Sequence, residues 1–375
     1  MSDSAAAEVA TLTRDLVQMD SRSRLSNLAI AERAEAALAG FEVERLDYTD
    51  AAGTPKRVLV AHRGGTAGSI GGVAFSGHLD TVPETGWQDD PWSARLDAEG
   101  VLHGLGSTDM KGPLAAAIVA ARGLPARVPV SLLITTDEET TKQGAREIAT
   151  RSALVRRVRP AAILVVEPTG MVPVRGHRSH IAFTAVATGV QAHSSTGKGL
   201  NANWALLPFC MEMRAIYERL RTDTNLQDPA YDPPFSDFNL IIDNHGAAVN
   251  VTVPKATASI KFRYSANRDP APIISAVHEA AARAGVALTE AREGRPPELP
   301  LDHPLVRLCA EATGREPRTA PFGTDASELQ AIAPCVVLGP GDIAEAHTPT
   351  EKVRIAELAA AVPVFQRIAE RVATG

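Results

Sequence analysis

Acidic and histidine side chains follow the ends of apolar runs at several places in this 375-residue sequence. The apolar run 128–134 leads into TTDEET, where Asp137, Glu138 and Glu139 place three carboxyl groups in succession. Carboxylates this close repel one another and raise one another's pKa, so they normally lie in water or are held by cations. A solvated turn is one interpretation of this stretch, and a metal site is the other.

Other acids and histidines follow the same arrangement. His78 ends the run VAFSGH with Asp80 two residues later, Glu167 ends AAILVV, and His347 follows CVVLGPG after a short loop. Asp109 stands in the Gly-rich segment GLGSTDMKG, just before an Ala-rich run. In open α/β sheets, ligands bind outside the carboxyl ends of the strands. These side chains are therefore predicted to meet at one edge of one sheet.

Each of these residues also has a simpler interpretation. Considered alone, His78 is a structural histidine and Glu167, before Pro168, is a turn residue. Asp109 alone is a helix N-cap, and His347 alone is a surface histidine. His78 and Asp80 share one face of an extended chain. The carboxylate of Asp80 can therefore accept the second ring N–H of His78 and fix its tautomer.

Considered together, the two histidines and three carboxylates indicate a metal site. They provide two sites of three protein ligands each if one carboxylate is shared. Two metal ions about 3.5 to 4 Å apart polarise a carbonyl group and activate water near neutral pH. Imidazole and carboxylate ligands suit zinc, with cobalt or manganese as substitutes. The sequence thus predicts two divalent metal ions, most suitably Zn, and hydrolytic chemistry.

The elements that position these residues follow from the apolar patterns. Segments 128–135 and 161–167 are apolar on both faces, as in strands of a sheet covered by helices on both sides. Helices are predicted near the N-terminus, including 27–39, and from Met110 to Arg122, where Pro113 occupies the first turn. The predicted fold is α/β, with a mixed, mainly parallel sheet and helices on both faces.

A different pattern begins after about residue 176. Strands here alternate apolar and polar residues, which indicates a sheet with one solvated face. Strands are predicted at 180–188, 238–242 and 259–264, and helices at 202–221 and 272–285, with a further strand after the second helix. This is the order of elements in a ferredoxin-like α+β layer. We therefore predict a catalytic metal-binding domain at 1–176 and 292–375, and an inserted domain at 177–291.

The composition favours a small-molecule enzyme. A net charge of -6 and a pI near 6.0 give no basic surface for nucleic acid or an anionic membrane. The N-terminus lacks the pattern of a secretory signal, and no apolar segment is long enough to span a bilayer, so a cytoplasmic location is expected. The three cysteines are odd in number and far apart, and are predicted to be buried free thiols.

Several motifs occur in order along nearly the whole chain: SGHLDTVP, GLGSTDMKG, TTDEETTKQGAR, EPTGMVPVRGH, GVQAHSS and LGPGDIAEAHTPTE. In this order they resemble the co-catalytic zinc amidohydrolase and metallopeptidase family that includes acetylornithine deacetylase, succinyl-diaminopimelate desuccinylase and glutamate carboxypeptidase. Among these members, VEPTGMVPVRGH and VVLGPGDIAEAH look most like acetylornithine deacetylase. The resemblance implies that the inserted domain is a lid through which the chain forms a homodimer.

The resemblance also implies a role for each candidate ligand. Asp109 would be shared by both metal ions, with the peptide bond after it often cis in this family. One ion would have His78 and Glu167 as its other ligands, and the second would have Glu139 and His347.

Catalytic and substrate-binding residues are carried over in the same way. Glu138 would be the general base, and Asp80 is counted with it because it orients a ligand histidine. His193 would come from the neighbouring subunit and stabilise the developing oxyanion. Arg263 would hold the substrate α-carboxylate, although a solvated charge on a strand is an equal interpretation. Substrate-binding groups are implied on both domains: Asn250, Arg263, Gly323 and Thr324.

The implied reaction is hydrolysis of an N-acyl amino acid, with N-acetyl-L-ornithine or a close analogue as substrate. Thr350 in TPTE stands where the closest members more often carry Asp, and FGTDASEL also differs locally, so the substrate is less securely implied than the mechanism. A desuccinylase, another N-acyl-amino-acid amidohydrolase, or a dipeptidase or carboxypeptidase are the alternatives among enzymes. A catalytically silent binding protein would require a missing ligand or base, and none is missing.

Overall fold

The computed structural model describes residues 3–65 and 71–374. Contacts divide the chain into two compact units, each with its own hydrophobic core. Unit 1 comprises Met1–Gly176, Pro297–Arg318 and Thr324–Gly375, and unit 2 comprises His177–Pro296 and Thr319–Gly323. The predicted division into a catalytic domain and a lid stays a prediction, because the contacts assign no role to either unit.

Unit 1 is built around an eight-stranded sheet. Its strands are β1 (Glu42–Thr49), β2 (Pro55–Arg63), β3 (Val73–His78), β6 (Val130–Thr135), β7 (Ala162–Val165), β8 (Val174–His177), β13 (Arg318–Ala320) and β14 (Cys335–Val337). They lie in the order β1-β2-β6-β3-β7-β14-β8-β13. The four central strands β6, β3, β7 and β14 run parallel, and the strands beside them are antiparallel. The predicted mixed α/β sheet is confirmed, with its parallel part at the centre.

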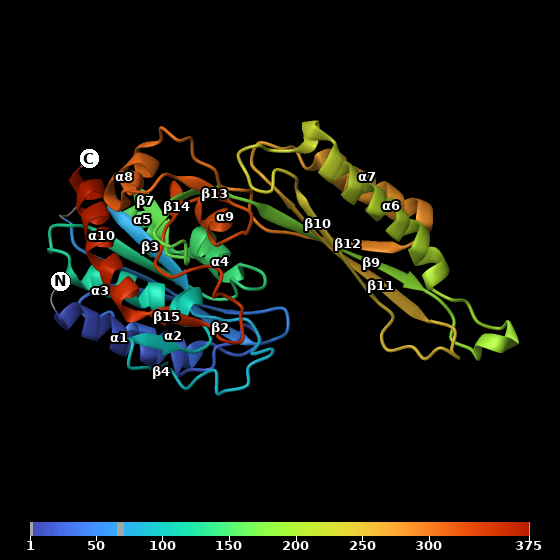
Figure 1. Ribbon diagram of the computed structural model, residues 1–375, viewed down its shortest axis with the longest axis horizontal. Coiled ribbons are helices and arrows are strands. Elements are labelled where there is room, and N and C mark those ends of the chain that lie inside the picture. Colours follow the sequence, from blue (N-terminus) through green and yellow to red (C-terminus); the bar gives the residue numbers. More distant parts are fainter. Residues whose placement is uncertain (1–2, 66–70, 375) are drawn as a thin grey trace. The chain divides into compact units, whose positions relative to one another are not determined.

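Helices cover both faces of this sheet: α1 (Asp3–Val17), α2 (Leu28–Ala36), α3 (Gly112–Gly123), α4 (Gln143–Arg151), α5 (Ala153–Val158), α8 (Pro304–Thr313), α9 (Ala326–Leu329) and α10 (Ile355–Thr374). Helices α1, α3 and α10 pack on one another over one face, and α4, α5 and α9 lie against the other (Figure 1). On the first face, Phe75 of β3 meets Phe365 of α10, with ring centroids 5.3 Å apart. Because both faces are covered, the central strands are buried along their whole length.

The segment before α3 departs from the predicted helix. Helix α3 begins at Gly112, and the φ angles of Asp109 (−119°) and Met110 (−135°) are not helical. The Asp109–Met110 peptide bond is cis, as the family resemblance implies. Pro113 lies in the first turn, as predicted. A small sheet that the sequence did not predict contacts this segment, with strands β4 (Arg95–Leu96), β5 (Val101–His103) and β15 (Lys352–Arg354).

Unit 2 contains a four-stranded antiparallel sheet in the order β10-β11-β9-β12. Its strands are β9 (Ser179–Thr188), β10 (Asp237–Asp243), β11 (Lys255–Tyr264) and β12 (Ala287–Arg292). Helices α6 (Asn203–Thr222) and α7 (Ala271–Ala284) lie side by side on one face (Figure 1). Buried residues alternate with partly exposed ones along β9, which confirms the predicted sheet with one solvated face.

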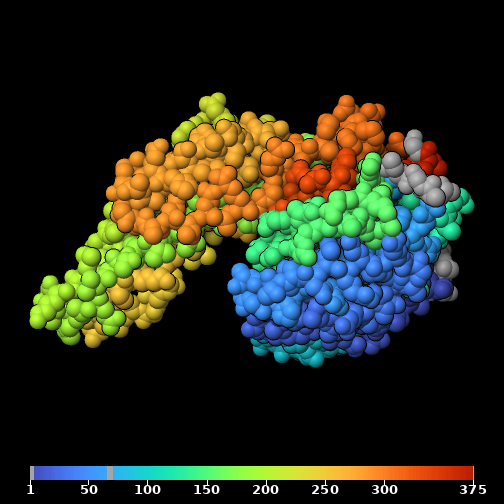
Figure 2. Space-filling view, turned by 180° about the vertical axis from the view of Figure 1, so that it is seen from behind, coloured from blue at the N-terminus to red at the C-terminus, as the bar shows by residue number. Residues whose placement is uncertain are grey.

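Strand β1 forms one edge of the large sheet. On the face that Figure 2 shows, the blue N-terminal part of the chain forms a continuous patch of the unit 1 surface. The three cysteines are buried and free, as predicted. Within 3–65 and 71–374, none of the helices combines the length and the apolar character that crossing a membrane requires.

Candidate metal centre

The carboxyl ends of the four central strands meet at one edge of the sheet, because these strands are parallel neighbours. Strand β3 ends at His78, β6 leads into the loop that carries the three acids, and β7 leads into Glu167. The loop after β14 carries His347, and the turn before α3 carries Asp109. The structure brings together all five predicted ligands in two groups: His78, Asp109 and Glu167, and Asp109, Glu139 and His347.

The first group is buried. His78 Nε2 lies 3.2 Å from Asp109 Oδ1 and 3.8 Å from Glu167 Oε1. One ligand atom from each of the three residues lies within 4.8 Å of the others. An imidazole nitrogen and two carboxylate oxygens therefore converge on a single position.

The second group lies partly at the surface. His347 Nε2 is 3.0 Å from Glu139 Oε1 and 3.3 Å from Asp109 Oδ2, and its side chain is 53% exposed. The backbone of His347 is in the left-handed region, with φ 60°. An open side leaves room for a substrate to approach this group.

Asp109 belongs to both groups through different atoms. Its Oδ1 faces His78 and its Oδ2 faces His347, which is the geometry of a bridging carboxylate. Its backbone is held by the buried carboxylate of Glu351, whose Oε1 accepts the N–H groups of Thr108 at 2.8 Å and of Asp109 at 2.9 Å. Glu351 Oε2 accepts the N–H of Gly106 at 3.0 Å. Glu351 closes the TPTE motif, but no pattern in the sequence predicted this contact.

Burial and charge perturb the whole cluster. Burial, with the charge of Asp109 next, raises the pKa of Glu139 to about 7 and the pKa of Glu167 well above its usual range. Burial also raises the pKa of Asp109, but hydrogen bonds from His347 and His78 outweigh it and hold that pKa far below its usual range. Hydrogen bonds to Asp109 and Glu139 raise the pKa of His347 to about 11. Buried carboxylates crowded in this way are stabilised by cations.

Comparison with known proteins agrees with this geometry. Residues 74–371 match the model of peptidase family M20/M25/M40. The chain belongs to this family. The acetylornithine deacetylase of Proteus mirabilis (strain HI4320) is 34% identical over 307 residues, which cover 78% of this chain and 77% of that protein. The acetylornithine deacetylase of Myxococcus xanthus is 32% identical over 382 residues, which cover 98% of each chain.

Solved structures of M20 enzymes have the same fold. A tripeptidase from Staphylococcus aureus matches with a TM-score of 0.75 and 19% identity over 99% of both chains. An M20 family metallo-carboxypeptidase from Sulfolobus solfataricus matches with a TM-score of 0.74 and 15% identity, over 98% of this chain and 100% of that chain. The match to the family model and the relatives above 30% identity confirm the predicted family, and the chain is a metal-dependent hydrolase of amide bonds.

The divalent metal ions that membership in the M20 family implies fit the residues present. Each group offers one imidazole nitrogen and two carboxylate oxygens within 4.8 Å. Divalent ions of the zinc type take such nitrogen and oxygen donors. Divalent ions would also stabilise the ionised form of the crowded carboxyl groups of Glu139, Glu167 and Asp109.

Asp80 departs from the predicted contact. The nearest acceptor for His78 Nδ1 is the backbone carbonyl of Asp80 at 2.9 Å, whereas the carboxylate Oδ1 lies at 3.5 Å. The carboxylate instead accepts the N–H groups of Glu138 (3.2 Å) and Glu139 (3.3 Å) and the hydroxyl of Ser23 (2.7 Å). Asp80 therefore orients the ligand histidine through its main chain, and its side chain holds the loop with the two glutamates.

Glu138 is buried and is not a member of either ligand group. Its Oε1 has no hydrogen-bond partner among the described residues and lies 3.8 Å from Lys142 Nζ. Burial raises the pKa of Glu138, and the positive charge of Lys142 opposes that shift. A buried carboxylate oxygen without a partner matches a general base better than a structural residue.

Three predicted residues of unit 2 lie in its loops and strands. His193 is exposed, and its Nδ1 lies 2.8 Å from the hydroxyl of Ser195. Asn250 is exposed in the loop before β11, where its carbonyl accepts the N–H of Ser194. Arg263 of β11 is paired with Asp237, directly opposite on β10, at 2.5 Å. The catalytic and substrate-binding roles of these three residues stay predictions.

Gly323 and Thr324 are neighbours in the sequence but are assigned to different units. Gly323 is the last residue of a unit 2 segment, and Thr324 is the first residue of the unit 1 segment that follows. Gly323 is partly exposed, and Thr324 is buried, with its hydroxyl accepting the N–H of Ala326 at 3.1 Å. Their predicted roles in substrate binding also stay predictions.

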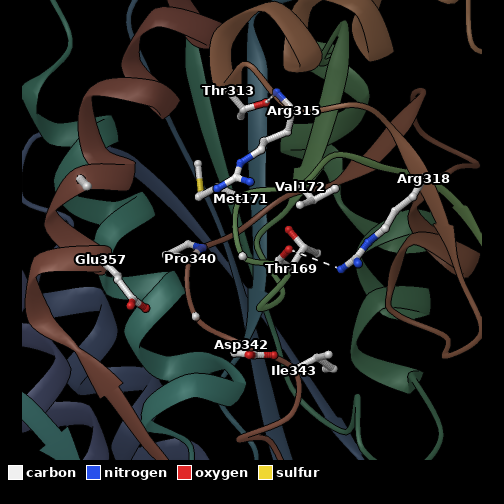
Figure 3. Close-up of a pocket in the computed structure, with 13 residues that line it drawn as sticks. Thr169, Met171, Val172, Thr313, Arg315, Arg318, Pro340, Asp342, Ile343 and Glu357 are labelled. Carbon is white, nitrogen blue, oxygen red and sulfur yellow. Dashed lines mark hydrogen bonds between the residues drawn. The ribbon is translucent and has the colours of Figure 1, made fainter.

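A separate cavity of about 620 Å³ opens on unit 1 beside the loops that follow β7 and β14 (Figure 3). Its charged lining residues are Arg315, Arg318, Asp342 and Glu357, all of them exposed. The carbonyl of Thr169 lies 3.5 Å from Arg318 Nη2, as the dashed line shows. None of the five metal-ligand candidates is among the described residues that line this cavity, so it is distinct from the metal centre.

Proposed function

We propose that the chain hydrolyses the amide bond of an N-acyl amino acid, with N-acetyl-L-ornithine or a close analogue as substrate. The products are acetate and the free amino acid. The observation that carries the proposal is the pair of ligand groups that share Asp109. The acetyl group and the amino acid are inferred from the names of the relatives that are more than 30% identical.

The five candidate ligands are proposed to hold two divalent ions, preferably zinc, with cobalt or manganese as substitutes. When bound, such ions polarise the substrate carbonyl and lower the pKa of water. Asp109 would hold both ions at a fixed separation, since its two oxygens face different groups. The exposed side of His347 is the side from which the substrate would enter.

Glu138 is proposed to act as the general base. Its Oε1 is buried and unpartnered among the described residues, so it is available to take a proton from the attacking water. The same oxygen then returns that proton to the nitrogen of the leaving amine. Asp80 supports this step by fixing the main chain of Glu138 through the hydrogen bond to its N–H.

The residues of unit 2 are proposed to bind substrate and the developing charge. Arg263 would bind the substrate α-carboxylate through its guanidinium fork, although Asp237 competes for the same group. His193 would donate a hydrogen bond to the oxyanion from the second subunit of a dimer. Asn250 and Gly323, and Thr324 of unit 1, are also proposed to bind substrate.

Exposed apolar residues support the proposed homodimer through unit 2. Helix α6 exposes Trp204 (69%), Leu207 (45%) and Met211 (73%). Their spacing of three and four residues places them on one helical face. Strand β10 is an edge strand and exposes Ile241 (60%) and Ile242 (50%). Apolar surface of this kind beside an open sheet edge is typical of an interface.

Replacing Trp204 and Met211 together with glutamate is expected to convert the dimer to a monomer, because each chain would then bring two like charges into the apolar interface. Light scattering after size-exclusion chromatography measures the mass. The control is Ala282→Glu, which adds a charge on the exposed side of α7. A dimer that persists in the double variant would show that this face of α6 is not the interface.

The substrate is tested with a panel of N-acetyl, N-succinyl and N-acyl amino acids and dipeptides. The zinc-loaded protein is expected to have its highest kcat/KM on N-acetyl-L-ornithine. Treatment with a chelator is expected to abolish turnover, and added zinc or cobalt to restore it. Faster cleavage of a dipeptide or a succinylated amino acid would replace the proposed substrate, and activity indifferent to chelators would contradict the metal mechanism.

A further inference from the structure

Asp137 is the first of the three successive acids, and its carboxylate does not belong to either ligand group. Its Oδ1 lies 2.7 Å from Lys56 Nζ, and its Oδ2 accepts the hydroxyl of Tyr48 at 2.6 Å. Both Asp137 and Lys56 are buried. The three acids therefore face different partners, and of the three only Glu139 belongs to a ligand group.

Lys56 reaches this carboxylate because of the pairing of β1 with β2. Tyr48 and Lys56 are directly opposite each other in that pair, so their side chains share one face of the sheet. The ammonium group of Lys56 also donates to the backbone carbonyl of Ser23 and, at 2.9 Å, to that of Leu25. The three N–H donors of Lys56 thus each have an acceptor. The carboxylate of Asp50 is further away, with its Oδ2 4.0 Å from Lys56 Nζ.

The main chain of Asp137 fixes the turn that carries Glu138 and Glu139. Asp137 has φ 61°, in the left-handed region. Its carbonyl accepts the N–H groups of Thr141 at 3.0 Å and of Lys142 at 2.7 Å, which closes the turn after the two glutamates. Asparagine and aspartate tolerate this backbone region better than most residues, and the contacts of the Asp137 carboxylate with Lys56 and Tyr48 hold the residue in place.

A second set of contacts holds the same two glutamates from the other side. The carboxylate of Asp80 accepts the N–H groups of Glu138 and Glu139, and the hydroxyl of Ser23 donates to that carboxylate at 2.7 Å. Lys56 holds the carbonyl of the same Ser23. One buried ammonium group therefore connects both supports of the segment Glu138–Glu139.

We propose that Lys56, with Asp137 and Tyr48, is a positioning residue for the general base Glu138 and the ligand Glu139. The proposal rests on the proposed function, because those two roles give the segment its importance. Lys56 touches neither substrate nor metal ion in this assignment. It acts by fixing the direction in which the two glutamate side chains leave the main chain.

The test is the variant Lys56→Met, which keeps the length of the side chain and removes its charge and donors. We expect kcat to fall roughly 10- to 100-fold, because a shift of about 1 Å in a catalytic group costs about that much. KM should stay within about threefold, since no substrate contact is lost. The amount of bound metal should fall from two ions to one per chain, because Glu139 serves only one group.

The matched control is Arg57→Met. Arg57 is the next residue on the same strand, and its guanidinium pairs with Asp47 at 2.7 Å on the other face of the sheet. This variant is expected to retain wild-type kcat and two metal ions. Tyr48→Phe, which removes a single hydrogen bond to Asp137, should lower kcat less than Lys56→Met does.

The outcomes separate this inference from the proposed function. A wild-type protein that binds no metal ion overturns the proposed function and the inference with it. A wild-type protein with two ions, combined with a folded Lys56→Met variant of normal kcat and metal content, overturns the inference alone. A variant that loses thermal stability while its folded fraction keeps full kcat has the same consequence, because the role of Lys56 is then only structural.

Discussion

Replacing Glu138 with glutamine is expected to abolish turnover while both metal ions stay bound. The glutamine keeps the size of the side chain but cannot take a proton from water. Loss of a general base costs roughly 10²- to 10⁴-fold in rate. Metal binding should be unaffected, because Glu138 belongs to neither of the two ligand groups. Turnover under substrate saturation and metal analysis of the same sample measure both effects.

The contrasting variant is Glu139→Ala, at the adjacent position of the same loop. Glu139 Oε1 lies 3.0 Å from His347 Nε2 in the second ligand group. Its removal should therefore release one metal ion, whereas Glu138→Gln should release none. Equal loss of metal from the two variants would contradict the assignment of one glutamate as base and the other as ligand. Normal turnover in Glu138→Gln would show that another group is the base.

The sequence predicted the site better than it predicted the connections that hold it. His78 ends a buried strand, Glu167 and His347 follow buried strands, and parallel strands bring their carboxyl ends to one edge. Apolar runs identify such strands, so the meeting of these side chains can be predicted without knowing the order of the strands. The sequence also predicted Asp109 as a candidate in the Gly-rich segment before α3, and the resemblance to the family supplied its role as the shared ligand.

The supporting residues could not be predicted in this way. Glu351 and the Gly-rich turn that it holds are separated by more than 240 residues in the chain. Lys56 and Asp137 lie on separate elements, and a lone lysine near the start of a strand is typical of a solvated residue. No periodicity connects such partners, because the contacts depend on how β1, β2 and the loop after β6 pack in three dimensions.

The same limit explains the corrected detail at Asp80. Its position two residues after His78 predicts a carboxylate that faces the imidazole, as alternation along an extended chain requires. The strand ends at His78, however, so Asp80 lies beyond the regular pairing of β3. The carbonyl of Asp80 then faces the ring, and its carboxylate turns to the N–H groups of the neighbouring loop.

Replacing Asp109 with alanine is expected to have a larger effect than the loss of the base. Asp109 alone belongs to both ligand groups, with Oδ1 facing His78 and Oδ2 facing His347. Its removal should therefore release both metal ions. The rate should fall by more than the roughly 10²- to 10⁴-fold expected for a missing base, because polarisation of the carbonyl and activation of water are lost together.

The matched comparison is the metal content of single-group variants. Glu167→Ala and Glu139→Ala each remove a ligand from one group only, so each should retain one ion per chain. Asp109→Ala should retain none under the same dialysis conditions, and circular dichroism should confirm that all three variants are folded. One tightly bound ion in Asp109→Ala would show that the two groups are independent sites. Loss of both ions in Asp109→Ala, with one ion retained in each of the other two variants, would instead identify the Asp109 carboxylate as the bridge of the dinuclear site.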